Sequence, residues 1–208
     1  MQIDSFILVG GRSSRLGRDK AFVQLGGESL YERAATTLKQ AFQGENITLV
    51  GSKKQQFGDT EPFLKYPVIY DIYPDRGPLG ALHAALRNAA SDWIAILACD
   101  LPFVSAKMLQ RLTIFISDDH DAVVPVQPDG RFQPLAALYR VERCFTFLNE
   151  KLRKDNETPA LASVLEKLTT QAVPFAEISD IPGSENFFLN INNPGDLENA
   201  QRLNISAV

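Results

Sequence analysis

Short apolar runs that alternate with amphipathic stretches constrain the fold of this chain most. Seven runs have the length and composition of buried strands, and they begin at Phe6, Ile47, Pro67, Trp93, Ala122, Leu135 and Phe187. Most are separated by segments with helical spacing of apolar residues, at 29–42, 80–90, 105–116, 141–152, 159–168 and 194–203. This alternation predicts an α/β fold with a mostly parallel sheet that helices cover on both faces.

The stretch VQPDGRFQP interrupts the alternation. It places Pro128, Asp129 and Gly130 in turn positions between two strand-like runs, which predicts a hairpin and hence an antiparallel strand in a mixed sheet. No repeat, low-complexity tract or Pro/Gly-rich linker divides the sequence. We therefore expect residues 1–208 to form a single domain.

Two helix starts carry capping signals. Ser29 followed by Glu32 matches the sequence pattern of a capping box. Asn193 stands before Pro194, which predicts an N-cap followed by proline at the first helical position.

Composition excludes several classes of protein. The net charge of −4 and the pI near 5.3 argue against broad binding to nucleic acid or anionic membranes. No apolar run approaches the roughly 18 residues of a membrane helix, and no signal-peptide pattern opens the chain, so we expect a cytoplasmic protein. Cys99 and Cys144 are expected in the core, and with His83 and His120 they suggest neither a disulfide framework nor a zinc site.

The first apolar run leads into a glycine-rich basic loop. This loop carries four basic residues and one acidic residue, namely Arg12, Arg15, Arg18, Lys20 and Asp19. Its spacing fits neither a Walker loop nor the dinucleotide fingerprint, because five residues separate Gly11 from Gly17 and no GxGxxG occurs. A local anion site is expected there, since glycines let backbone amides approach phosphate.

Glycines and polar residues follow several apolar runs, at the place where α/β proteins bind ligands, beyond the carboxyl ends of the strands. They are Gly10 and Gly11, Asp71, Asp100, and the amides Asn190 and Asn192. Together with the basic loop, these residues suit a nucleoside triphosphate with a divalent cation, which carboxylate oxygens can hold.

Four ordered segments between Leu8 and Leu197 carry a resemblance to a known family. They are LVGGRSSRLGRDK, YDIYPDRGPLGALHAAL, ILACDLPFVS and FFLNINNPGDL, and they closely resemble the motifs of the MobA-like nucleotidyltransferases. The resemblance implies a three-layer α/β/α fold of the nucleotide-diphospho-sugar transferase type with a mostly parallel, mixed sheet. It also implies transfer of GMP from GTP to the terminal phosphate of molybdopterin, with release of pyrophosphate and with Mg²⁺ as cofactor.

The resemblance also implies roles for individual residues. The nucleotide side consists of Leu8, Val9 and Gly10 at guanine and ribose, Gly11 and Arg15 near the phosphates, Lys20 on the phosphates, and Asp71. Catalysis is assigned to Arg15, Lys20 and Asp100, metal binding to Asp100 and Asn192, and the acceptor side to Asn190 and Asn192. Asp75 is the alternative to Asp71 for the role on the nucleotide side. Gly51 and Ser52 stand where the family has an asparagine after the second strand. The basic candidates for the molybdopterin side are Arg131, Arg140 and Arg153.

Structural interpretations of the same residues stay open at this point. Lys20 and Arg15 alone are typical solvated charges, and Asp100 suits a helix start or turn. Gly77, Pro78 and Gly80 can serve close helix packing, and one of Asn190 and Asn192 can satisfy a backbone edge.

The alternatives in function are transfer of another nucleotide, by a molybdopterin cytidylyltransferase or a sugar-phosphate nucleotidyltransferase, and a non-enzymatic nucleotide-binding homologue. Arg15, Lys20 and Asp100 are all present, which speaks against the non-enzymatic homologue. We expect a monomer that contacts Mo-cofactor insertion proteins or apoenzymes transiently, and neither nucleic acid nor membrane.

Overall fold

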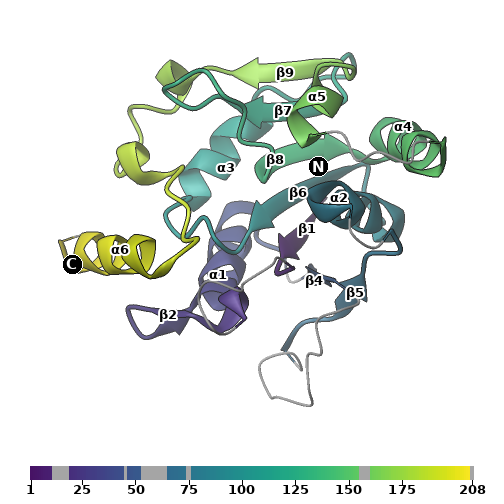
Figure 1. The fold of residues 1–208 in the computed structure, drawn as a ribbon. Helices are drawn as coiled ribbons and strands as arrows, with labels where there is room; N and C mark the ends of the chain where they lie inside the picture. The colour runs from purple at the N-terminus through teal and green to yellow at the C-terminus, as the bar shows by residue number, and fades with distance from the viewer. Residues whose placement is uncertain (11–18, 45, 53–64, 74–75, 155–159, 207–208) are drawn as a thin grey trace.

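A seven-stranded sheet forms the centre of the computed structural model, which describes residues 1–10, 19–44, 46–52, 65–73, 76–154 and 160–206 (Figure 1). Its spatial order is β5 (Val68–Tyr70), β4 (Ile47–Gly51), β1 (Ile3–Leu8), β6 (Trp93–Ala98), β8 (Ala136–Arg140), β7 (Ala122–Pro125) and β9 (Thr170–Val173). Strand β8 runs antiparallel to both neighbours, and the other pairs are parallel. The predicted mixed, mostly parallel sheet is confirmed.

Helices cover both faces of the sheet and give three layers (Figure 1). Helices α1 (Leu30–Phe42) and α3 (Ala106–Thr113) contact each other, and α2 (Gly77–Asn88) and α4 (Val141–Lys154) contact each other. The described residues also form α5 (Leu161–Leu165), α6 (Pro194–Ser206), η1 (Lys20–Phe22), η3 (Phe175–Glu177) and η4 (Ser184–Asn186). Within the described ranges, no helix is long and apolar enough to cross a bilayer.

The predicted capping signals are confirmed. Ser29 and Glu32 form the capping box at the start of α1. Asn193 accepts a hydrogen bond from the backbone N–H of Asp196 at 3.0 Å, with Pro194 as the first residue of α6. The predicted hairpin is also present, because β7 pairs with β8 and Val126 bridges to Phe132 across the turn.

The strand predicted at Phe187 does not form. Phe187 and Ile191 are both 1% exposed whereas Leu189, between them, is 37% exposed, which is not the alternation of a strand. A turn after η4 carries this segment, and Ile191 donates its backbone N–H to the carbonyl oxygen of Asp100 at 3.0 Å.

Two elements lacked a clear sequence signal. Strand β9 contains Thr170 and Gln171 and lies at the sheet edge, where it pairs with β7. Strands β2 (Gln24–Leu25) and β3 (Glu28–Ser29) form a short hairpin through two glycines with positive φ, Gly26 and Gly27. Both elements are too short and too polar for a periodicity argument.

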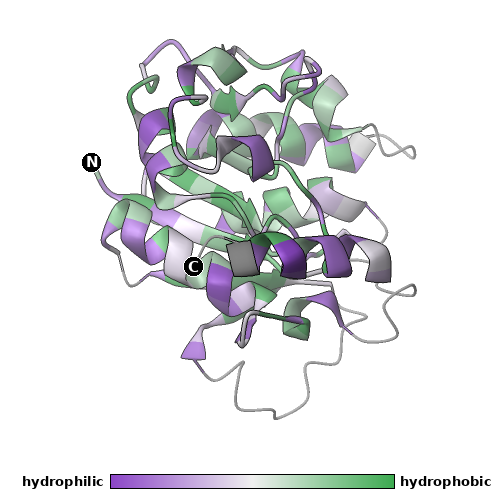
Figure 2. Cartoon of the chain, turned by 90° about the vertical axis from the view of Figure 1, so that its left-hand side faces the viewer, coloured by the Kyte–Doolittle hydropathy of each residue, from purple (hydrophilic) through white to green (hydrophobic). Residues whose placement is uncertain are grey.

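The register brings several strand ends to one edge. Leu8 is paired with Ala98, and Val50 with Leu8, so β1, β4 and β6 end together. All six residues of β6 are buried, and Figure 2 shows hydrophobic colour along the central strands, whereas the helices carry both hydrophilic and hydrophobic colour. A rigid, buried strand therefore leads directly to Asp100.

Asp4→Ala is expected to destabilise the fold and to leave the site intact. The buried Asp4 carboxylate accepts hydrogen bonds from Ala90 N at 2.6 Å, Ser91 N at 2.9 Å and Ser91 Oγ at 3.1 Å, at the opposite end of β1. Removing the acceptor of these donors should lower the free energy of unfolding by about 2 kcal/mol. Urea denaturation measures this change. The exposed Asp92 provides the control variant Asp92→Ala, which should stay within about 0.5 kcal/mol of the parent. An unchanged stability of Asp4→Ala would contradict this role.

Candidate active site

Three segments far apart in the sequence meet at the carboxyl edge of the sheet. The Nζ atom of Lys20 donates to Asp100 Oδ2 at 2.8 Å and to Asn192 Oδ1 at 2.9 Å. Lys20 lies in η1, Asp100 follows β6, and Asn192 precedes α6. The structure thus brings together three of the residues that the sequence singled out.

Each of these side chains is placed by its own local structure. The Asp19 carboxylate caps η1 by accepting from Ala21 N at 3.1 Å, which orients the turn that carries Lys20. Asp100 is fixed through the buried β6, and Ile191, which precedes Asn192, donates its backbone N–H to the Asp100 carbonyl oxygen. The Lys20 and Asp100 side chains are 17% and 23% exposed, so their ion pair is partly shielded from water.

The carboxylate of Asp100 has one oxygen left for a ligand. Its Oδ2 contacts Lys20, whereas its Oδ1 is buried and has no hydrogen-bond partner among the described residues. The described part of the chain holds no cluster of three His, Cys, Asp or Glu side chains that could enclose a metal by itself. One carboxylate and one amide oxygen suit Mg²⁺, which commonly takes its other ligands from substrate phosphates and water.

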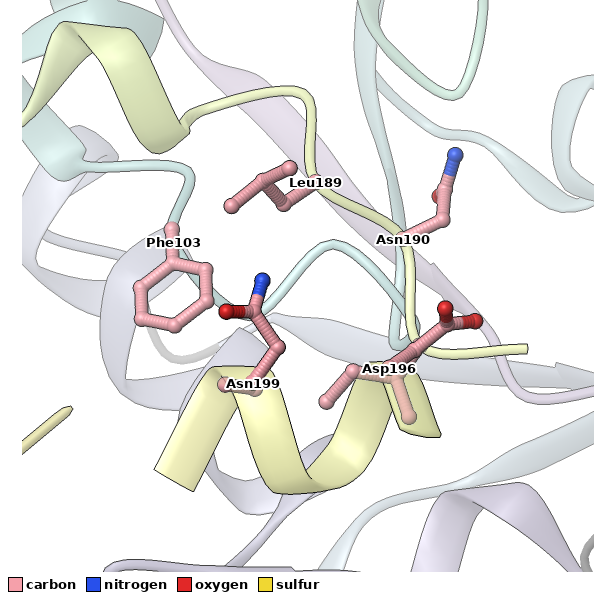
Figure 3. A pocket seen from close by; sticks show the side chains of 7 residues that line it. Phe103, Leu189, Asn190, Asp196 and Asn199 are labelled. Atoms are coloured by element: carbon pink, nitrogen blue, oxygen red, sulfur yellow. The ribbon is translucent and has the colours of Figure 1, made fainter. Parts of the chain in front are cut away.

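Asn190 and Asn192 occupy different surroundings, although the sequence placed both on one side of a strand. Asn192 contacts Lys20, whereas Asn190 lines a pocket of about 60 Å³ together with Phe103, Leu189 and residues of α6. In Figure 3 the Asn190 amide points away from the Phe103 ring. Since the segment is a loop, its residues do not keep the two-residue period of a strand.

The residues predicted for the nucleotide side lie at the ends of β1 and β5. The side chains of Leu8 and Val9 are buried in the core, and Gly10 after them is exposed. Asp71 is 7% exposed, and its backbone N–H donates to the carbonyl oxygen of Gly51 at 3.1 Å. Side chains at positions 8 and 9 therefore serve packing, and Gly10 offers accessible backbone at this edge.

The Gly-Pro-Leu-Gly segment beside Asp71 has clear structural roles. Gly77 has φ +53°, which favours glycine, and Pro78 stands in the first turn of α2. A Cβ atom on Gly80 would lie 3.0 Å from the Tyr73 carbonyl oxygen and 3.5 Å from Asp71 Cγ. The absence of a side chain at Gly80 thus lets α2 approach Asp71 closely.

Several predicted residues lie outside the described ranges or away from the site. Gly11, Arg15 and Asp75 belong to the first group, so the choice between Asp71 and Asp75 stays a prediction. Arg140 pairs in register with Trp93, the first residue of β6, and therefore lies at the edge opposite Asp100. Arg131 lies in the hairpin after β7, at the same edge as Asp100, where it forms an ion pair with Asp129.

The cysteines are core residues, as predicted. Burial, followed by the neighbouring Asp100 carboxylate, raises the pKa of the Cys99 thiol well above its usual range. Burial raises the pKa of Cys144 to about 12. Both thiols are protonated at neutral pH and are poor nucleophiles.

Sequence reasoning missed Asp196 as part of this site. Its carboxylate accepts from the backbone N–H of Asn192 at 2.7 Å and of Asn193 at 3.1 Å. The signal was present, because Asn193 and Asp196 have the three-residue spacing of a reciprocal cap.

A three-layer α/β/α fold with an ammonium, a carboxylate and an amide at its carboxyl edge defines a nucleotidyltransferase of the nucleotide-diphospho-sugar transferase type. The family model described as MobA-like NTP transferase domain matches residues 5–172. The chain belongs to this family, which confirms the resemblance drawn from its motifs.

Individual relatives cover nearly the whole chain. A protein of Vibrio atlanticus named molybdenum cofactor guanylyltransferase is 32% identical over 92% of this chain and 91% of its own length. A protein of Carboxydothermus hydrogenoformans named probable molybdenum cofactor guanylyltransferase is 30% identical, with coverage of 92% and 91%. The crystal structure of molybdopterin-guanine dinucleotide biosynthesis protein A from Archaeoglobus fulgidus superposes with a TM-score of 0.80 at 25% identity, covering 99% of this chain and 100% of that one.

Proposed function

We propose that this chain is a molybdenum cofactor guanylyltransferase, which transfers GMP from GTP to the terminal phosphate of molybdopterin and releases pyrophosphate. The meeting of Lys20, Asp100 and Asn192 at one point carries this proposal, because it gives a site for phosphate and a divalent cation at the ligand-binding edge. The names of the relatives, which match over nearly their full length, support the choice of substrates.

The chemistry requires positioning more than acid–base catalysis. A phosphate monoester has its second pKa near 6, so the molybdopterin phosphate is largely dianionic at pH 7 and needs no general base. One of its oxygens forms a bond to the α-phosphorus of GTP, and the bond from that phosphorus to the oxygen bridging to the β-phosphorus breaks. The residues of the site hold the two substrates in line and offset the negative charge.

Lys20 and Arg15 are proposed to neutralise the phosphates, and Asp100 with Asn192 to hold Mg²⁺. When bound, Mg²⁺ neutralises charge on the transferring phosphoryl group and on pyrophosphate. The buried Oδ1 of Asp100, which has no hydrogen-bond partner among the described residues, supports this assignment.

The nucleoside is proposed to lie at Leu8, Val9, Gly10 and Gly11, with Asp71 accepting hydrogen bonds from its donors. Because the Leu8 and Val9 side chains are buried, these two residues are proposed to contact the nucleoside through their backbone atoms. Molybdopterin is proposed to bind beside Asn190 and Asn192. Of Arg131 and Arg140, we retain Arg131 on this side, since Arg140 lies at the opposite edge.

We further propose that the whole chain acts as one nucleotidyltransferase domain, as a cytoplasmic monomer that meets Mo-cofactor insertion proteins or apoenzymes transiently. Gel filtration over a range of concentrations tests the monomer.

GTP is expected to be the preferred nucleotide. The LVGG spelling after β1 resembles the guanine-using branch of the family, whereas cytidine-using relatives tend to carry alanine before the last glycine. Turnover should be measured with molybdopterin, Mg²⁺ and each of the four triphosphates, with pyrophosphate release as readout. A preference for CTP would make the chain a cytidylyltransferase, and binding of GTP without turnover would favour the non-enzymatic homologue.

A further inference from the structure

The loop that carries Asn192 is closed by a reciprocal cap at the start of α6. Asp196 Oδ2 accepts from the backbone N–H of Asn192 and of Asn193, while Asn193 Oδ1 accepts from the backbone N–H of Asp196. Figure 3 shows the Asp196 side chain rising from the first turn of α6 toward the loop segment that contains Asn190. A carboxylate in this position is also favoured by the helix dipole.

Packing alone does not hold Asn192 in place. Its side chain is exposed, and the neighbouring Ile191 anchors only the preceding part of the loop, through its buried side chain and its bond to the Asp100 carbonyl. On the following side, the bonds to Asp196 fix the backbone of residues 192 and 193. The orientation of Asn192 Oδ1 toward the Lys20 ammonium therefore depends on Asp196.

Helix α6 is also anchored near its C-terminal end, which fixes the position of the helix that carries Asp196. Asn204 Oδ1 accepts from Arg33 Nη2 at 2.8 Å, and the same nitrogen donates to the Leu25 carbonyl at 3.3 Å. Figure 1 shows α6 beside β2, and a Cβ on Gly26 would collide with the Asn204 amide. The helix thus bridges the hairpin that follows Lys20 and the loop that carries Asn192.

We propose that Asp196 is a positioning residue of the active site, which acts through Asn192 on Lys20 and Asp100. Its effect on catalysis rests on the guanylyl transfer proposed above. Its effect on the loop does not, because that follows from the backbone hydrogen bonds alone.

Asp196→Ala should release the loop, whereas Asp196→Asn, which keeps an acceptor oxygen, should largely retain it. We expect amide hydrogen exchange at residues 192 and 193 to accelerate at least tenfold in the alanine variant and less than about threefold in the asparagine variant. Turnover should fall about tenfold in Asp196→Ala, the range for residues that orient a metal ligand. The control Glu198→Ala removes an exposed carboxylate from the same helix and should change neither quantity.

A double-mutant cycle with Asn192→Ala separates positioning from a general loss of stability. If Asp196 acts through Asn192, adding Asp196→Ala to the Asn192→Ala variant should lower turnover less than twofold further. Additive losses, or unchanged exchange at residues 192 and 193 in Asp196→Ala, would overturn the proposal. An inactive wild-type chain would overturn the proposed function instead, and the exchange rates would still decide whether Asp196 holds the loop.

Discussion

Asp100→Asn is expected to lower turnover by about 10²-fold or more while the fold survives. Asparagine keeps the shape of the side chain and can still accept a hydrogen bond from Lys20. It removes the negative charge that opposes the Lys20 ammonium and that we propose to hold Mg²⁺. The loss should be greatest at limiting magnesium, because a neutral amide binds the cation more weakly than a carboxylate does.

The competing interpretation gave Asp100 to a helix start or a turn; Asp100 does lie in a turn after β6, but it does not start a helix. Helix α3 begins at Ala106, and its N-cap is Ser105, whose Oγ accepts from Met108 N at 3.2 Å. The Asp100 carboxylate instead faces Lys20. No capping energy is therefore lost in the asparagine variant.

Turnover over a magnesium titration provides the measurement. Asp92→Asn is the matched control, since Asp92 is exposed and precedes the other end of β6. Asp92→Asn should unfold at nearly the parent temperature, and Asp100→Asn within roughly 2–4 °C of it, because this variant loses the ion pair with Lys20. Activity of Asp100→Asn close to the parent at limiting magnesium would remove Asp100 from the metal site.

The sheet and its site edge were predictable because the signals behind them are local and strong. Fully buried strands such as β6 appear as continuous apolar runs, and the polar residue that follows a run marks the carboxyl edge. Asp100 was found in this way. The antiparallel β8 followed from the turn residues around Asp129.

The conformation of the last motif was not predictable from its apolar pattern. The segment from Phe187 to Ile191 has the hydrophobic content of a strand, but it forms a turn after η4 and is joined to Asp100 by a backbone hydrogen bond from Ile191. The contact between Lys20 and Asn192 joins residues 172 positions apart and has no local signal. The family motifs and the position of these residues beyond apolar runs grouped them at one site, but neither predicted the direct contact.

Lys20→Ala should weaken GTP binding roughly 10- to 100-fold, which corresponds to the loss of about 1.5–3 kcal/mol for a hydrogen bond to a charged group. In the structure the Lys20 ammonium contacts both side chains that we propose for the metal, through Asp100 Oδ2 and Asn192 Oδ1. Lys20 must therefore exchange these acceptors for phosphate when nucleotide binds. Removing it should tighten Mg²⁺ binding to the nucleotide-free chain, since the Lys20 ammonium no longer repels the Mg²⁺ ion or neutralises the Asp100 carboxylate.

This opposite change in the two affinities distinguishes a phosphate-binding lysine from a structural one. The ion pair with Asp100 is only partly shielded, so its loss should cost about 1 kcal/mol of stability, or roughly 2–4 °C in Tm. Calorimetric titration with GTP and with Mg²⁺ alone gives both affinities, and Lys107→Ala controls for the removal of an exposed lysine from the start of α3. A large fall in Tm with unchanged GTP affinity would make Lys20 a structural residue. Weaker binding of both ligands would instead mean that Lys20 holds Asp100 and Asn192 in the geometry that the metal requires.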